Sequence, residues 1–261
     1  MGRFERMKIA IVTGASSGMG KEFVTQIDKK CYGLDEIWLI ARRKELMEEL
    51  QGKTEAKLRI FPVDVSNKIM MKQFEECLAI ENPNVKILVN CAGFGKTGSF
   101  QQVSKEDTLG MIDVNCIGLT SMTYSVLPYM TKHSYIINLA SIAGILPQPN
   151  FAVYAASKAY VLSFSRALRR EVKNRGIVVS AVCPGPVETE FFQIAEQTGK
   201  TFELKKYFYA NKEKVVSQAL KESFKKKEVI IYSLPMKALL ALVKVFPQNV
   251  ILDIYNKMLG N

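Results

Sequence analysis

The amino-acid sequence predicts an α/β fold in which helices flank a doubly wound parallel sheet of about seven strands. Strand-like runs alternate with helix-compatible segments along the 261 residues. Several of these runs are continuously apolar, as expected for parallel strands that helices cover on both faces. The sequence contains no Pro/Gly/Ser-rich linker and no repeat of fixed period, so we expect a single domain over residues 1–261.

The expected strands indicate where function should be sought. In a doubly wound sheet, ligands bind beyond the carboxyl ends of the strands, so the residues that follow each strand are the first candidates. The strand-like runs cover residues 8–13, 36–41, 58–62, 86–90, 135–140, 177–182 and 229–233.

Composition and charge argue against several classes of protein. The formal net charge is +11, but the basic residues are scattered beside 25 acidic ones without a recognition motif, so nucleic-acid binding is not expected. His133 is the single histidine, which argues against a metal site and a Ser-His-Asp hydrolase. The five cysteines form no Cys-x-x-Cys pair and indicate neither disulfides nor zinc.

The sequence also lacks the signals of secretion and of membrane insertion. The first apolar run, residues 9–12, is too short for the core of a signal peptide. No run approaches the roughly 18 apolar residues of a spanning helix. We therefore expect a cytoplasmic protein without a transmembrane segment.

A glycine-rich turn lies between the first expected strand and the first expected helix. Glycine permits a tight turn and a close approach to a pyrophosphate, whose charge the helix N-terminus stabilises. At this place in an α/β chain, such a turn favours a nucleotide site over an ordinary loop. The candidate contacts are Gly14, Ser16, Ser17, Gly18, Met19 and Gly20.

The end of the second expected strand indicates which dinucleotide would bind. About 20 residues after the glycines, an NAD-binding chain usually carries Asp or Glu for the ribose 2′-hydroxyl. Arg42 and Arg43 stand at that place here, and guanidinium groups match phosphate oxygens. The sequence therefore favours NADP(H) over NAD(H), with Arg42 as the main 2′-phosphate contact and Arg43 as a solvated charge.

Three side chains further along the chain suit the chemistry of a carbonyl or an alcohol. Tyr154 and Lys158 are four residues apart in an expected helix, so the ammonium can lie near the phenol and lower its pKa. Ser141, ahead of them, can supply a second hydroxyl. The Tyr-x-x-x-Lys spacing is weak evidence by itself, because the chain has 10 tyrosines and many lysines.

These motifs, with Asn90-Cys91-Ala92-Gly93, Asn115 and Pro184-Gly185 in the same order, resemble the short-chain dehydrogenase/reductase family. The resemblance covers residues 7 to about 190 and points to NADP-preferring members of the Tyr-x-x-x-Lys type, hydroxysteroid dehydrogenases among them. It implies a Rossmann-type fold and a homodimer or homotetramer.

The resemblance also implies a role for each residue. Tyr154 would be the catalytic acid/base, Ser141 would orient the substrate oxygen, and Lys158 would lower the tyrosine pKa while holding the nicotinamide ribose. Asn115 would anchor a water chain that relays the proton. Further cofactor contacts would be Asp64, Val65, Asn90, Ala92, Gly93, Pro184, Gly185, Val187 and Thr189.

Two positions depart from the family pattern. Some NADP-binding members carry a basic residue where Ser17 stands, which leaves Arg42 as the main argument for NADP. Cys91 replaces the Asn or Ala of many members. We interpret Cys91 as a small buried residue in preference to a redox-sensitive thiol.

The substrate is expected to contact two apolar segments, residues 143–153 and a lid at about residues 186–215. Their side chains suit a bulky lipophilic ketone or alcohol such as a steroid or a long acyl chain, although ordinary lid packing is an equal alternative. The residues concerned are Ile142, Ile145, Leu146, Phe151, Val187, Phe191, Phe192, Phe202, Tyr207 and Phe208.

Residues 221–261 form a variable C-terminal extension. Lys237 and Lys244 share one face of an otherwise apolar expected helix, and residues 250–259 are also helix-compatible. We interpret this pattern as packing or a subunit contact in preference to peripheral membrane contact.

The sequence thus predicts an NADP(H)-dependent oxidoreductase that interconverts a ketone and a secondary alcohol on a lipophilic substrate, with a hydroxysteroid ahead of a 3-oxoacyl thioester. The non-enzymatic alternative is a dinucleotide-binding regulator or scaffold. The complete set of Ser141, Asn115, Tyr154 and Lys158 argues against that alternative.

Overall fold

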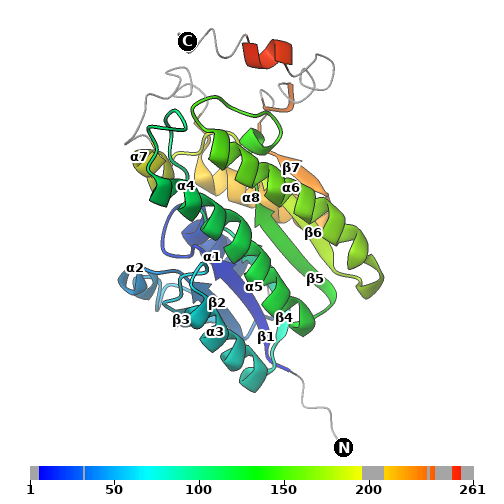
Figure 1. Cartoon of the computed structure of the whole chain (residues 1–261). Coiled ribbons are helices and arrows are strands. Elements are labelled where there is room, and N and C mark those ends of the chain that lie inside the picture. Colours follow the sequence, from blue (N-terminus) through cyan, green and yellow to red (C-terminus); the bar gives the residue numbers. More distant parts are fainter. Residues whose placement is uncertain (1–5, 32, 196–208, 234–235, 239–248, 254–261) are drawn as a thin grey trace, which may run out of the picture.

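The structure is a computed structural model that describes residues 6–31, 33–195, 209–233, 236–238 and 249–253. Its centre is a seven-stranded parallel sheet of order β3-β2-β1-β4-β5-β6-β7, which confirms the predicted fold class (Figure 1). The strands are β1 (Lys8–Thr13), β2 (Glu36–Ile40), β3 (Lys57–Phe61), β4 (Asn84–Asn90), β5 (Met130–Leu139), β6 (Val178–Cys183) and β7 (Val229–Ile231).

Helices connect the strands and cover both faces of the sheet. The α-helices are α1 (Gly18–Lys30), α2 (Lys44–Glu48), α3 (Lys68–Glu81), α4 (Lys105–Ile112), α5 (Leu119–Val126), α6 (Ala152–Glu171), α7 (Glu190–Ala195) and α8 (Lys212–Phe224). A π-helical segment, Asp113–Gly118, joins α4 to α5. Short 3-10 helices cover Leu127–Tyr129, Ile142–Gly144 and Lys173–Arg175.

Two apolar cores form because successive side chains of a strand point to opposite faces of the sheet. In β1, Ala10 and Val12 face the helices α1 and α8. Ile9 and Ile11, between them in the sequence, face α3, α5 and α6. Both sets are fully buried, which explains why the sequence of β1 is continuously apolar.

The start of β5 differs from the sequence prediction. The strand begins at Met130, five residues before the expected start at 135. Its first part is polar, contains His133 at φ 66°, and shifts register against β4. The Ser134 hydroxyl donates to the Val85 carbonyl at 2.9 Å, so this polar segment extends the pairing of β5 with β4 without an apolar pattern.

The carboxyl ends of the strands and the helix α7 lie at the same end of the molecule (Figure 1). The loops that follow β1, β2, β4, β5 and β6 meet there, as expected for parallel strands joined by helical crossovers. Among the described residues, no helix is both long and apolar enough to cross a bilayer.

Candidate active site

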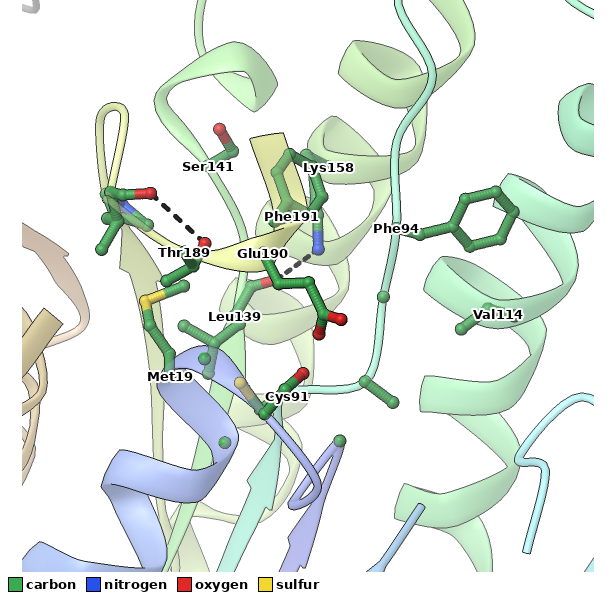
Figure 2. Close-up of a pocket in the computed structure, with 18 of the residues that line it drawn as sticks. Met19, Cys91, Phe94, Val114, Leu139, Ser141, Lys158, Thr189, Glu190 and Phe191 are labelled. Atoms are coloured by element: carbon green, nitrogen blue, oxygen red, sulfur yellow. Dashed lines mark hydrogen bonds between the residues drawn. The ribbon is translucent and has the colours of Figure 1, made fainter. Parts of the chain in front are cut away.

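One cavity runs along this end of the sheet and collects most of the predicted site residues (Figure 2). It is lined by the turn after β1, the ends of β2 and β3, the loop after β4, the segments around Ser141 and Tyr154, and the loop after β6. The predicted residues that line it are Gly14, Ser16, Ser17, Gly18, Met19, Gly20, Arg42, Asp64, Val65, Ala92, Gly93, Ser141, Tyr154, Lys158, Pro184, Gly185, Val187 and Thr189.

The glycine-rich turn has the shape that a phosphate group requires. Gly14 has φ 68°, and a Cβ atom there would lie 2.9 Å from the Ala92 backbone, so only glycine fits. The Thr13 hydroxyl accepts hydrogen bonds from the amides of Cys91 and Ala92, each at 3.0 Å, which joins this turn to the loop after β4.

Helix α1 begins directly after this turn. Its N-cap Ser17 makes no side-chain capping bond, and the first turn contains no acidic side chain. The helix N-terminus therefore faces the cavity with donors that its own side chains do not cap. These residues fit the phosphate groups of a dinucleotide.

The two arginines after β2 have different surroundings. Arg42 lines the cavity with its side chain 75% exposed, and its nearest carboxylate is Asp64, at 3.9 Å between Nη1 and Oδ2. Arg43 is not the solvated charge that the sequence suggested. Both of its terminal nitrogens donate to the Glu190 carboxylate, at 2.8 Å each.

The residues Ser141, Tyr154 and Lys158 come together from β5 and α6. Ser141 caps the short helix Ile142–Gly144 by accepting from the Ala143 amide at 3.2 Å. That short helix lies directly on α6, because a Cβ on Gly144 would be 2.5 Å from the Lys158 carbonyl oxygen. The Ser141 side chain lies close enough to the Tyr154 phenol to influence its pKa.

The lysine is oriented differently from the sequence expectation. The Lys158 ammonium donates to the Leu139 carbonyl at 2.8 Å (Figure 2). It lies 5.7 Å from the centroid of the Tyr154 ring. Burial raises the pKa of Tyr154 to about 12, and the nearby Ser141 side chain lowers it only in part. Burial also lowers the pKa of Lys158 to about 8. The pKa of Tyr154 is therefore raised, in contrast to the lowering that the sequence predicted.

Asn115 lies in the π-helical segment, a form of helix that often marks a functional site. Its side-chain amide donates to the Phe94 carbonyl and to the Ser157 hydroxyl at 3.0 Å, and its oxygen accepts from the Phe94 amide at 3.1 Å. Asn115 thus joins the loop after β4 to α6 next to Lys158, and it does not itself line the cavity.

Asn90 also lies outside the cavity lining, in contrast to the sequence expectation. Its amide nitrogen donates to Thr123 and to Asn138, both at 2.9 Å, below the cavity floor. The physical reason is the strand alternation: Asn90 is the last residue of β4 and points to the face of the sheet that α5 covers, whereas Ala92 and Gly93 follow in the loop.

The other end of the cavity is apolar and aromatic. The Phe151 ring stacks on Tyr154 with centroids 4.2 Å apart and an interplanar angle of 18°. The Phe191 ring, from α7, lies 5.5 Å from Tyr154, and Phe94 belongs to the same apolar cluster. Of the predicted lid, Phe202, Tyr207 and Phe208 and the side chain of Phe192 lie outside the described residues.

The predicted C-terminal extension is described only in part. Val229–Ile231 forms the last strand of the sheet, and residues 236–238 and 249–253 are helical. Lys244 and the greater part of the expected helices, at 235–247 and 250–259, lie outside the described residues.

Sequence reasoning missed two contributions to the site. The first is the Leu139 carbonyl, which accepts a hydrogen bond from Lys158. Because it is a backbone group, the identity of residue 139 does not reveal it. Only the general rule that a buried ammonium needs a hydrogen-bond acceptor could have indicated it. Glu190 was missed because its partner Arg43 lies 147 positions earlier in the chain.

The thiols of Cys91 and Cys183, near the site, are unreactive in character because their raised pKa values keep them protonated. Burial raises the pKa of Cys91 and of Cys183 to about 12, so both stay protonated at neutral pH. A protonated thiol is a poor nucleophile, which agrees with the interpretation of Cys91 as a small packing residue.

Comparison with known proteins identifies the family. The pattern of the short chain dehydrogenase family matches residues 8–199. The chain is similar to the NADP-dependent 3-hydroxy acid dehydrogenase YdfG of Escherichia coli strain K12, at 36% identity over 194 residues that cover 71% of this chain and 75% of that protein.

Two further similarities support the same assignment. A 3-ketodihydrosphingosine reductase of Bacteroides thetaiotaomicron is 33% identical over 198 residues, which cover 74% of this chain and 70% of that protein. A short-chain dehydrogenase from Sphingobium yanoikuyae, solved in complex with NADPH, has a TM-score of 0.76 at 25% identity and covers 94% of this chain and 95% of that one. With a family match over most of its length and the geometry described above, this chain belongs to the short-chain dehydrogenase family of oxidoreductases.

Proposed function

We propose that this protein is an NADP(H)-dependent oxidoreductase that interconverts a ketone and a secondary alcohol on a lipophilic substrate. The observation that carries the proposal is the convergence of Ser141, Tyr154 and Lys158 on one end of the cavity that Gly14 and Arg42 line at its other end. A phosphate turn and a proton donor in one continuous cavity are what a hydride-transfer enzyme needs.

Preference for NADP(H) rests on Arg42. Its exposed guanidinium lines the cavity just after β2, and no described residue binds it more closely than Asp64 at 3.9 Å. The name of the Escherichia coli relative and the NADPH in the Sphingobium yanoikuyae structure support the same preference. When bound, the nicotinamide supplies or accepts the hydride.

The proton is handled by Tyr154. As hydride adds to a carbonyl carbon, negative charge develops on the carbonyl oxygen, which then needs donors at short range. With a pKa of about 12, the Tyr154 phenol is protonated at neutral pH and can donate to that oxygen, and the Ser141 hydroxyl is the second donor. Oxidation of an alcohol uses the same groups in reverse.

Lys158 supports this transfer through its charge. The described partner of its ammonium is the Leu139 carbonyl, and an ammonium can donate three hydrogen bonds. Ribose hydroxyls of the cofactor are suited to the remaining donors and would favour the charged form. Asn115 acts as a positioning residue, because it holds the Phe94 backbone and Ser157 beside Lys158. We propose that it also anchors the water chain that returns the proton.

The substrate is proposed to be lipophilic because aromatic rings surround the reacting phenol. Phe151 and Phe191 contact the Tyr154 ring, and the neighbouring cluster is apolar. A hydroxysteroid or a long-chain ketone would fit such a surface, and the name of the Bacteroides thetaiotaomicron relative favours the long-chain lipid. A 3-oxoacyl thioester is the alternative substrate within the same reaction class.

A substrate panel tests the proposal. Steroid ketones, long-chain 3-ketones and 3-oxoacyl thioesters would be incubated with NADPH while its absorbance is followed. Tyr154→Phe should reduce kcat by about 10²–10⁴-fold and leave NADPH binding intact. Tyr129→Phe, directly before β5 and outside the cavity lining, is the matched control. Wild-type protein that binds NADPH but turns over no ketone would instead support a regulator or scaffold.

We further propose that the protein is a cytoplasmic homodimer or homotetramer. Adjacent helices present exposed apolar side chains, and a hydrogen bond of 2.8 Å between Thr120 and Tyr160 joins α5 to α6 beneath them. The exposed residues are Leu109, Ile112, Ile117, Tyr124 and Tyr160. Tyr124, 82% exposed, is the best probe: Tyr124→Asp should yield monomers in light scattering if this face pairs.

A further inference from the structure

A carboxylate bridge crosses the cofactor cavity. Glu190, the first residue of α7, accepts both terminal nitrogens of Arg43 at 2.8 Å each. The Ser17 side chain lies close enough to the Glu190 carboxylate to contribute to lowering its pKa. The three residues come from the loop after β6, the end of β2 and the turn after β1, and all three line the cavity.

The donors of this bridge are those that proteins use for phosphate. A guanidinium fork binds two oxygens of a planar or tetrahedral anion, and a serine hydroxyl at a helix N-terminus adds a third donor. Here an ionised side chain of the protein itself is the ligand, because the hydrogen bonds from Arg43 lower the pKa of Glu190. Arg43 and Ser17 therefore form an anion site that is already filled.

The neighbouring Arg42 differs from Arg43 in its contacts. Arg42 precedes Arg43 directly and keeps an exposed guanidinium in the same cavity. Arg42 is available to an incoming phosphate, whereas Arg43 is neutralised by its bidentate ion pair. A phosphate that approached both arginines would have to compete with the Glu190 carboxylate.

We propose that Glu190 is a selectivity-determining residue, whose carboxylate occupies an anion site of Arg43 and Ser17 and yields it to the 2′-phosphate of the incoming dinucleotide. The inference rests on the proposed NADP(H) dependence and deepens it. Binding of NADP(H) exchanges a carboxylate ligand for a phosphate ligand, whereas NAD(H), without the 2′-phosphate, leaves the bridge intact.

The exchange has a consequence for the substrate end. Glu190 directly precedes Phe191, whose ring lies 5.5 Å from that of Tyr154. Release of Glu190 frees the first residue of α7, the helix that carries this ring. Binding at the phosphate end is thereby coupled to the aromatic surface around the reacting phenol.

The test measures nucleotide binding without any ketone. Dissociation constants for NADPH and NADH are determined by fluorescence titration for wild type, Glu190→Gln, Arg43→Gln and the double variant. Glu190→Gln removes the competing charge, so NADPH should bind about three- to tenfold more tightly while NADH changes less than about twofold. In the Arg43→Gln background, the same change should have no effect on NADPH.

The matched control is Glu188→Gln. It removes the same charge two residues earlier in the same loop, but Glu188 does not line the cavity. If Glu188→Gln tightens NADPH as much as Glu190→Gln does, the effect is general electrostatics and the inference is wrong. Melting curves without nucleotide verify that each variant is folded, and Glu190→Ala serves as a second removal of the carboxylate.

Failure of this inference is distinguishable from failure of the proposed function. An unchanged NADPH/NADH ratio in Glu190→Gln, in an enzyme that still turns over ketone with NADPH, overturns the role of Glu190 alone. Weaker NADPH binding in Glu190→Gln also overturns it, because the bridge would then support the bound state. Wild-type protein that binds neither nucleotide overturns both proposals.

Discussion

The two ends of the cavity differ in the atoms that form them, backbone atoms at one end and side chains at the other. At the phosphate end, the backbone makes the site: Gly14 adopts φ 68° against Ala92, and α1 begins directly after the turn. At the substrate end, side chains from separate segments make it, with Phe151 and Phe191 on either side of Tyr154 in the sequence. A backbone site tolerates almost no substitution, whereas a cluster of rings can be retuned residue by residue.

The largest difference between the two ends is expected at Gly14. Gly14→Ala should lower stability by about 1–3 kcal/mol and abolish NADPH binding, because the left-handed backbone and the contact with Ala92 both oppose a Cβ atom. Thermal melting and NADPH titration measure the two effects. Gly52→Ala is the control, since Gly52 also has a positive φ of 73° but nothing within 4 Å of its Cβ position. Equal losses in both variants would show that backbone strain alone is responsible.

The next largest effect is expected at Arg42, where a substitution should change the affinity for NADPH but not for NADH. Arg42→Ala should raise the dissociation constant of NADPH by about 10–100-fold, since a hydrogen bond to a charged group contributes about 1.5–3 kcal/mol. NADH should be nearly unaffected. Lys44→Ala removes a charge in the same region, paired with Glu48 and outside the cavity lining, and should change neither. Equal weakening of NADPH and NADH would contradict the assignment of Arg42.

A smaller effect is expected at the substrate end. Phe191→Ala removes a ring that contacts Tyr154 and should raise KM for a bulky ketone about tenfold, in the range of lost apolar contacts. The NADPH dissociation constant should change much less than it does in Arg42→Ala, because Phe191 adjoins the bridge residue Glu190 but its ring makes none of the hydrogen bonds of the bridge. Phe100→Ala, at a ring that is 69% exposed, controls for the loss of an aromatic side chain. A loss of NADPH affinity in Phe191→Ala as large as that in Arg42→Ala would mean that the ring itself supports cofactor binding.

The smallest expected effect is a dependence of kcat/KM on pH through the ionisation of Lys158. The Lys158 amine, with a pKa of about 8, is charged below that pH and neutral above it. If, as we propose, the charged form holds the ribose and supports proton transfer, kcat/KM for NADPH, which reports the free enzyme, should fall by about fourfold from pH 7 to pH 8.5. Lys158→Arg keeps the charge at all these pH values and should retain a flat profile at reduced activity. A flat profile in wild type would show that the neutral amine suffices.

Much of this protein could be predicted from local sequence. The positions of the strands follow from buried apolar runs such as β1 and β2, in which both faces are covered. The polar beginning of β5 could not be found in this way, because its pairing with β4 depends on hydrogen bonds such as that from Ser134. Its residues have no apolar period that would indicate a strand.

The site residues, too, could be predicted from the sequence only in part. The loop after β4 places Ala92 and Gly93 in the cavity, whereas Asn90, at the end of the strand, turns toward α5, and the sequence motif alone does not distinguish these positions. The direction in which the pKa of Tyr154 shifts could also not be predicted from the sequence. It depends on how deeply Tyr154 is buried and on the turn of Lys158 toward Leu139.

By itself, the sequence determined the fold class and predicted the glycine-rich turn and the candidate reacting groups, because glycine angles, strand periods and helical spacing act over a few residues. Only the tertiary structure decided which of two adjacent arginines is available to a ligand. Arg43 is taken by Glu190, 147 positions away, while Arg42 stays exposed. Pairings across such distances depend on how the crossovers bring loops together at one end of the sheet, and no local pattern encodes them.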